Sequence, residues 1–179
     1  MLAASEAPMT RYQIGAGSQL RVTARSRVHD TSTTWDTITG EVDADGATLA
    51  TTGARARFTV DMTRFDAGDW LKNRKLRKDY DLERHAKAEF ELTALDGVVA
   101  GDAGFKARAR GVLRWRGKEV ALELAGDGRL TGDRLDATGT FELDLRTLGL
   151  AAPRFLMFKV EDEVTVVVTL RGVARPEAA

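Results

Sequence analysis

The sequence predicts an all-β protein, built as an eight-stranded antiparallel barrel with a short helix between two of the strands. Three observations support this fold class. Apolar and charged residues alternate with period two through most of the chain, as they do in strands with one face in water. Turn-forming Gly and Asp residues separate the alternating segments, and helical periodicity is almost absent. A chain of 179 residues is long enough for one domain with a substantial core.

The alternation defines eight predicted strands. In the clearest one, from Phe105 to Trp115, every odd-numbered residue is apolar or Gly, and four of the five even-numbered residues are Lys or Arg. Such a strand buries one face and exposes the other. The eight segments are residues 20–28, 37–42, 54–62, 88–94, 105–116, 119–124, 139–146 and 164–171.

Turn signals lie between these segments, and the short spacing around Gly117 predicts a tight hairpin. Gly132–Asp133 is a further candidate turn, which would leave residues 129–130 as a short ninth strand. The other turn signals are Asp43–Gly46, Asp96–Gly97, Arg116–Lys118 and Gly126–Gly128.

Two stretches depart from the alternation. Residues 66–78 contain good helix formers, and they predict a short helix or an ordered loop between two strands. Residues 147–160 are rich in large apolar side chains, and they predict a second irregular excursion.

The predicted inward face carries many small residues, whereas a self-filled barrel needs large ones to reach the packing density of protein interiors. We therefore expect a cavity that holds an apolar ligand. The alternative is that large residues of the two excursions (Trp70, Leu71, Phe155, Leu156 and Phe158) fold inward and plug the barrel. The expected ligand-binding residues are Ala24, Phe58, Trp70, Leu71, Phe90, Ala107, Ala109, Trp115, Phe141, Phe155 and Phe158.

Three stretches resemble the YceI-like family, whose members are lipocalin-like, polyisoprenoid-binding domains. They are residues 74–92 (RKLRKDYDLERHAKAEFEL), residues 111–124 (GVLRWRGKEVALEL) and the closing strand pair within residues 141–170. The resemblance implies a lipocalin-like barrel over residues 11–173, with flexible termini at 1–10 and 174–179. It also implies a hydrophobic tunnel for an isoprenoid-like or other long-chain lipid, in a bacterial protein of the stress response.

A basic run follows the start of the predicted helix. Its simplest interpretation is a solvated helix face, because charged residues usually face water. The functional interpretation is a charged lip at the barrel mouth, where Arg74, Lys75 and Arg77 meet an anionic head group, since Arg and Lys both bind phosphate.

The sequence gives little support for catalysis, and we expect a binding protein without a catalytic residue, metal or cofactor. The chain has no Cys, only two His residues, and neither a P-loop nor a Gly-x-Ser-x-Gly motif. Its net charge of zero argues against a nucleic-acid partner. The sequence contains no membrane-spanning apolar stretch and no signal peptide, so we expect a cytoplasmic protein, or a periplasmic one if this is a trimmed mature form. A homodimer is compatible with these features.

Overall fold

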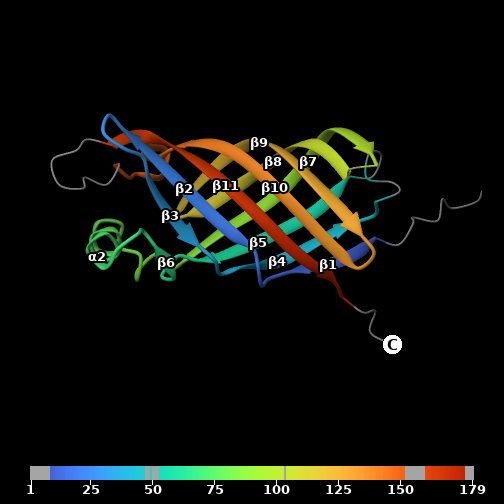
Figure 1. The fold of residues 1–179 in the computed structure, drawn as a ribbon, viewed down its shortest axis with the longest axis horizontal. Coiled ribbons are helices and arrows are strands. Elements are labelled where there is room, and N and C mark those ends of the chain that lie inside the picture. Colours follow the sequence, from blue (N-terminus) through green and yellow to red (C-terminus); the bar gives the residue numbers. More distant parts are fainter. Residues whose placement is uncertain (1–8, 47–48, 50–52, 103, 152–159, 176–179) are drawn as a thin grey trace, which may run out of the picture.

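The structure is a computed structural model, and it describes residues 9–46, 49, 53–102, 104–151 and 160–175. Figure 1 shows an elongated barrel of strands with one helix at one end. The elements are β1 (Thr10–Ile14), β2 (Gln19–Ser26), β3 (Thr31–Trp35), β4 (Ile38–Ala44), β5 (Ala54–Asp61), β6 (Phe65–Asp66), α2 (Trp70–Asp79), β7 (Lys87–Gly101), β8 (Gly104–Trp115), β9 (Lys118–Thr131), β10 (Arg134–Asp144), the 3₁₀ helix η1 (Leu145–Leu148) and β11 (Val160–Ala174).

The barrel closes through a ring of antiparallel pairs in the order β1, β4, β5, β7, β8, β9, β10 and β11, with β11 pairing back to β1. This confirms the predicted closed eight-stranded antiparallel barrel. The remaining strands continue the sheet along one side: β2 pairs with β11, β3 with β2, and β6 with β3. Closure gives the strands of the ring hydrogen-bonding partners on both sides, which removes most of the sheet edge.

β1 and β2 lie one after the other along β11, so they act as one strand with a break between them. Ser18 lies at this break and is almost fully buried. Its hydroxyl accepts a hydrogen bond from the backbone N–H of Arg171 at 2.9 Å and donates one to the Arg171 carbonyl at 3.2 Å. The Arg171 carbonyl also accepts a hydrogen bond from the Gly15 N–H at 3.2 Å, so Ser18 and Gly15 together satisfy the backbone groups of β11 that face the break.

Two predicted turns proved wrong, because the strands run through them. β7 continues through Asp96–Gly97, where its pairing with β8 shifts register, as it also does between Leu92 and Ala94. β9 continues through Gly126–Gly128, and the predicted ninth strand at residues 129–130 is the end of β9.

The tight hairpin is confirmed: Arg116 and Gly117, with φ of 57° and 71°, join β8 to β9. Both residues lie in the left-handed region of backbone conformation. A two-residue turn of this kind has a twist that matches the twist of the flanking strands. The turn at Gly132–Asp133 is likewise present between β9 and β10.

Helix α2 confirms the helix predicted within residues 66–78, although it begins only at Trp70. Asp69 caps it, since its carboxylate accepts a hydrogen bond from the Lys72 N–H at 2.9 Å. The preceding residues Phe65 and Asp66 pair with β3 instead. Leu76 is buried, and Tyr80 directly after the helix is buried too, so one side of α2 packs over the end of the barrel (Figure 1).

Candidate functional site

A cavity of about 300 Å³ lies inside the barrel. Its wall is formed by both groups of core side chains, one at the α2 end that includes Trp35 and Leu148, and one at the far end that includes Ile38 and Leu49. The cavity therefore extends along the barrel rather than sitting at one end. Its volume is at the lower limit of the range for ligand-binding pockets.

Inward-facing side chains around the cavity are only partly buried, although the barrel surrounds them. Val22, Phe58, Leu124 and Phe141 all point inward and are half-buried. In a close-packed core such residues would be buried completely. Their accessibility shows that the described side chains do not fill the interior.

Small residues on the wall have two different roles, which the sequence does not distinguish. Ala107 and Ala109 border the cavity, as expected. Other small positions are covered by neighbouring side chains: a Cβ on Gly128 would lie 2.6 Å from the ring of Phe105, and one on Gly139 would lie 2.5 Å from Leu124. Only part of the small-residue wall therefore contributes to the open volume.

The α2 end of the cavity is bordered by Leu76 and Tyr80 of the helix segment and by Leu145 of η1. The Tyr80 hydroxyl donates a hydrogen bond to the Ala151 carbonyl at 3.1 Å, and the Arg116 guanidinium donates one to the Tyr80 carbonyl. Burial raises the pKa of Tyr80. Tyr80 thus stays neutral and presents its ring to the cavity.

Two indole groups fix the wall next to this end. The Trp35 Nε1–H donates to the Met62 carbonyl at 3.2 Å, and the Trp115 Nε1–H donates to the His85 carbonyl at 2.8 Å. Each buried indole therefore satisfies its only polar atom on the backbone and leaves carbon to face the cavity.

Two buried threonines of β3 contribute hydroxyl groups to the otherwise largely apolar wall. Thr31 and Thr33 of β3 point inward, are buried, and border the cavity on the same strand as Trp35. Neither side chain makes a hydrogen bond to another group within the described part of the chain. They are polar contacts that a bound molecule can use.

The structure places most of the predicted ligand-binding residues on the cavity wall: Ala24, Phe58, Phe90, Ala107, Ala109, Trp115 and Phe141. Trp70 and Leu71 differ. Their side chains are 66% and 63% exposed on α2, because the helix turns Leu76 inward instead, so neither residue plugs the barrel nor lines it. Phe155 and Phe158 lie outside the described residues, as does Leu156.

The predicted lip residues all belong to α2. Arg74 is exposed, whereas Lys75 forms an ion pair with Asp79 at 3.0 Å. Arg77 pairs with Glu83 at 3.1 Å and lies over the ring of Phe65. Two of the three cations are therefore already engaged within the protein.

The sequence interpretation missed Leu76, Tyr80, Thr31 and Thr33 as cavity residues. A signal for the first pair was present, since Leu76 and Tyr80 are spaced by four residues, and this places them on one helix face. Thr31 and Thr33 alternate in phase with Trp35, but hydroxyl residues do not stand out as wall residues.

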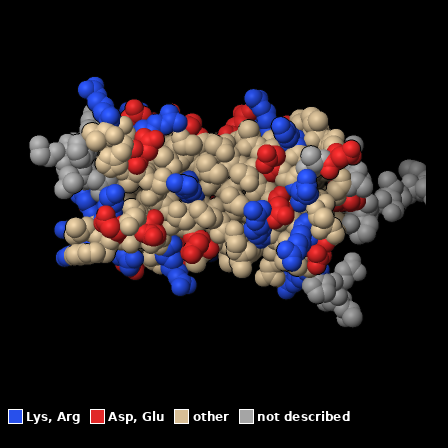
Figure 2. Space-filling model, in the orientation of Figure 1, with Lys and Arg blue, Asp and Glu red and all other residues tan. Residues whose placement is uncertain are grey.

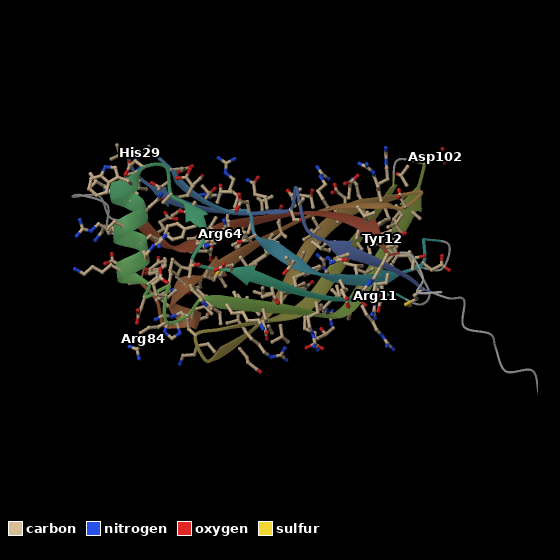
Figure 3. All side chains as sticks on the ribbon, turned by 90° about the horizontal axis from the view of Figure 1, so that it is seen from below. Arg11, Tyr12, His29, Arg64, Arg84 and Asp102 are labelled. Carbon is tan, nitrogen blue, oxygen red and sulfur yellow. The ribbon has the colours of Figure 1, made fainter. Side chains whose placement is uncertain are left out.

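Neither of the two histidines is among the described residues that border the cavity. His29 is exposed in the turn after β2 (Figure 3), because β2 ends at Ser26. Among the described residues, no cluster of His, Asp or Glu could hold a metal ion.

No helix in the described part of the chain is long and apolar enough to cross a membrane. Acidic and basic side chains are interspersed along the barrel wall (Figure 2), and many form ion pairs, such as Arg108 with Glu123 at 3.4 Å.

Comparison with solved structures returns barrels of the same fold. The crystal structure of BcnA from Burkholderia cenocepacia aligns with a TM-score of 0.72 at 22% identity, covering 86% of this chain and 95% of that one. A polyisoprenoid-binding domain from Saccharophagus degradans, implicated in plant cell wall breakdown, aligns with a TM-score of 0.72 at 14% identity, covering 93% and 99%. The YCEI protein of Campylobacter jejuni aligns with a TM-score of 0.64 at 10% identity, covering 80% and 84%.

Among curated proteins, none matches the sequence. The model of the YceI-like domain matches residues 12–172, which is most of the chain, and the protein therefore belongs to the YceI-like domain family.

Proposed function

We propose that this protein binds an amphiphilic lipid with an isoprenoid-like chain inside the barrel and carries it without chemical change. The observation behind the proposal is the apolar cavity of about 300 Å³ that extends along the barrel and borders both ends of its core. The structural neighbour from Saccharophagus degradans, a polyisoprenoid-binding domain, supports the same class of ligand.

The driving force for such binding is the transfer of the lipid chain out of water. Each buried methylene contributes about 0.8 kcal/mol, so a chain of several isoprene units needs few polar contacts. Ordering a flexible chain and losing its translational freedom offset part of this gain. Ala107 and Ala109 support this role, because their small side chains leave room beside the aromatic wall residues.

The polar end of the ligand has two candidate locations. Inside the barrel, the Thr31 and Thr33 hydroxyls suit a neutral hydroxyl or carbonyl group, since a charged group would lose its hydration there. Outside, the basic residues of α2 suit an anionic head group, and Arg74 is exposed for this purpose. A neutral lipid can therefore lie fully inside, whereas a prenyl phosphate would leave its head group at the α2 lip of Arg74, Lys75 and Arg77.

Native mass spectrometry of the purified protein, followed by organic extraction, tests the proposal. We expect an adduct that is removed by denaturation and that matches an extractable lipid, or, for protein stripped of lipid, saturable binding of a fluorescent prenyl alcohol. A bare protein mass together with no binding of prenyl alcohol or prenyl phosphate would overturn the proposal. That result would favour the alternative, a barrel whose surface binds a protein partner.

The absence of catalysis, the absence of a nucleic-acid partner, a homodimeric state, a bacterial origin and a role in stress response remain predictions. Light scattering during size-exclusion chromatography measures the oligomeric state directly. An esterase or phosphatase activity that persists through purification, and that is lost in His29→Ala, would contradict the non-enzymatic role.

A further inference from the structure

The outward face of α2 combines exposed apolar and basic side chains. Trp70 and Leu71 start this face, and Arg74 and Lys78 follow four and eight positions after Trp70, so all four project on the same side of the helix. All four are exposed. The opposite side carries Leu76, which is buried against the barrel and borders the cavity.

The exposure of two adjacent large apolar residues requires an explanation, because such patches mark interaction sites. Trp70 and Leu71 are 66% and 63% exposed. Val28 is also exposed, in the turn after β2, and its neighbour His29 lies at the same end of the barrel as α2 (Figure 3). Trp is a residue typical of membrane–water interfaces, since its ring is apolar and its N–H is polar.

The charges of α2 are strongly one-sided, although the chain as a whole has no net charge. The helix contains five basic residues and one acidic residue, Asp79. Lys75 and Arg77, at the edges of the outward face, pair with acidic groups of the protein. Arg74 and Lys78 have no ion-pair partner among the described residues, so the outward face presents uncompensated positive charge.

We propose that the outward face of α2 docks on the surface of an anionic lipid bilayer. Trp70 and Leu71 would enter the head-group region, and Arg74 and Lys78 would contact lipid phosphates, as in amphipathic helices that lie on membranes. Charge complementarity selects an anionic surface over a neutral one. Because Leu76 and Tyr80 border the cavity directly beneath this face, docking brings the barrel end against the bilayer. The transfer of lipid through this end rests on the proposed lipid binding, whereas the docking itself does not.

Flotation of the full chain with vesicles tests the docking. We expect binding to phosphatidylcholine vesicles that contain phosphatidylglycerol, weaker binding to phosphatidylcholine alone, and a decrease with added salt because the charges are screened. The Leu71→Asp/Arg74→Glu variant should bind the anionic vesicles on the order of tenfold more weakly.

The other end of the barrel offers a matched control. Val99 and Lys106 face each other across the β7–β8 hairpin and are both exposed, at the end remote from α2 (Figure 1). Val99→Asp/Lys106→Glu changes the charge by the same amount, and we expect it to bind like the unmodified chain. Equal losses in both double variants, or no binding of the unmodified chain, would overturn the proposal.

Fluorescence locates the contact. Trp35 and Trp115 are buried, so the difference in emission between the unmodified chain and Trp70→Phe reports mainly on Trp70. We expect this difference spectrum to shift to shorter wavelength with anionic vesicles, and to be quenched by brominated lipids. An unchanged difference spectrum during binding would overturn the role of α2. Binding of prenyl alcohol by the unmodified chain, measured without vesicles, separates failure of docking from failure of the lipid-binding proposal.

Discussion

The ring of Phe90 occupies the place that a side chain at Gly111 would need. A Cβ built on Gly111 would lie 2.2 Å from Cζ of Phe90 and 2.6 Å from the backbone oxygen of Glu91. Phe90 lies on β7 and Gly111 on β8, and Phe90 pairs with Leu113 two positions further along β8. The absence of a side chain at Gly111 therefore lets the aromatic ring lie over this position of the neighbouring strand, and Gly111 does not border the cavity.

We expect Gly111→Ala to lower the free energy of unfolding by about 1–3 kcal/mol, because the new methyl group overpacks the wall. Denaturant unfolding measures the change. Gly101→Ala is the control, since a Cβ there meets nothing within 4 Å and should change stability little. Phe90→Leu in the Gly111→Ala background should restore part of the loss, while full stability of the single variant would contradict the proposed contact.

Ala109→Trp should abolish lipid uptake, because Ala109 lies on the cavity wall in the middle of β8 and an indole would occupy the open volume. The fold should remain, as the ring enters existing space. Titration with a fluorescent prenyl alcohol, together with thermal melting, measures both effects. Arg110→Trp places the same ring on the outer face of the strand and should leave uptake intact. If Ala109→Trp instead loses about 1–3 kcal/mol in stability, and neither this variant nor the unmodified chain binds the ligand, the barrel is filled by its own side chains.

The two inward hydroxyls predict a preference for polar ligand ends. Thr31→Val/Thr33→Val removes both hydroxyls at nearly constant volume. We expect binding of a prenyl alcohol to weaken by about 0.5–1.5 kcal/mol for each hydrogen bond lost. Binding of a hydrocarbon such as squalene should be unchanged or tighter, because the wall becomes more apolar. Equal weakening for both ligands would show that the two residues act only through packing.

The basic residues of α2 should distinguish anionic from neutral ligands. Replacing Lys72, Arg74, Lys75 and Arg77 together by Gln should weaken binding of a prenyl phosphate on the order of tenfold, about 1.4 kcal/mol, and leave a prenyl alcohol unaffected. Calorimetric titration without vesicles measures both. The matched control replaces four cations on the outer face of β8: Lys106, Arg108, Arg110 and Arg114. If affinity for both ligands stays unchanged in the α2 variant, its basic run is only a solvated helix face.

The closure of the barrel between β1 and β4 should depend on pH. The Arg11 guanidinium donates two hydrogen bonds to Asp43, at 2.8 and 3.0 Å, and these hold the pKa of the Asp43 carboxyl below its ordinary value. A lowered pKa in the folded state gives stability that is complete above the unfolded pKa of about 3.9 and is lost as pH falls through the folded value. The unmodified chain should therefore exceed Asp43→Asn in stability at neutral pH, and this difference should shrink in acid. Unfolding curves across pH measure it, with the exposed Asp36→Asn as control. A difference that is constant down to the lowest pH would exclude the ionised pair as its cause.

The sequence predicted the barrel because alternation is a local property of each strand. A residue such as Phe141 faces inward once its neighbours Thr140 and Glu142 face outward, whatever the partner strand is. The hairpin at Arg116–Gly117 was predictable for the same reason, since a short turn depends on its own residues. Most of the predicted wall residues therefore lie where expected.

Only the tertiary structure decided the features that depend on contacts between distant residues. The register shift between Leu92 and Ala94 turns Leu95 inward, and the adjacent strand β8 determines it, since no local signal distinguishes a bulge from a turn. Which face of α2 is turned toward the barrel follows from the burial of Leu76 and Tyr80 against the barrel end. That packing, and not helix propensity, places Trp70 on the outside of the protein.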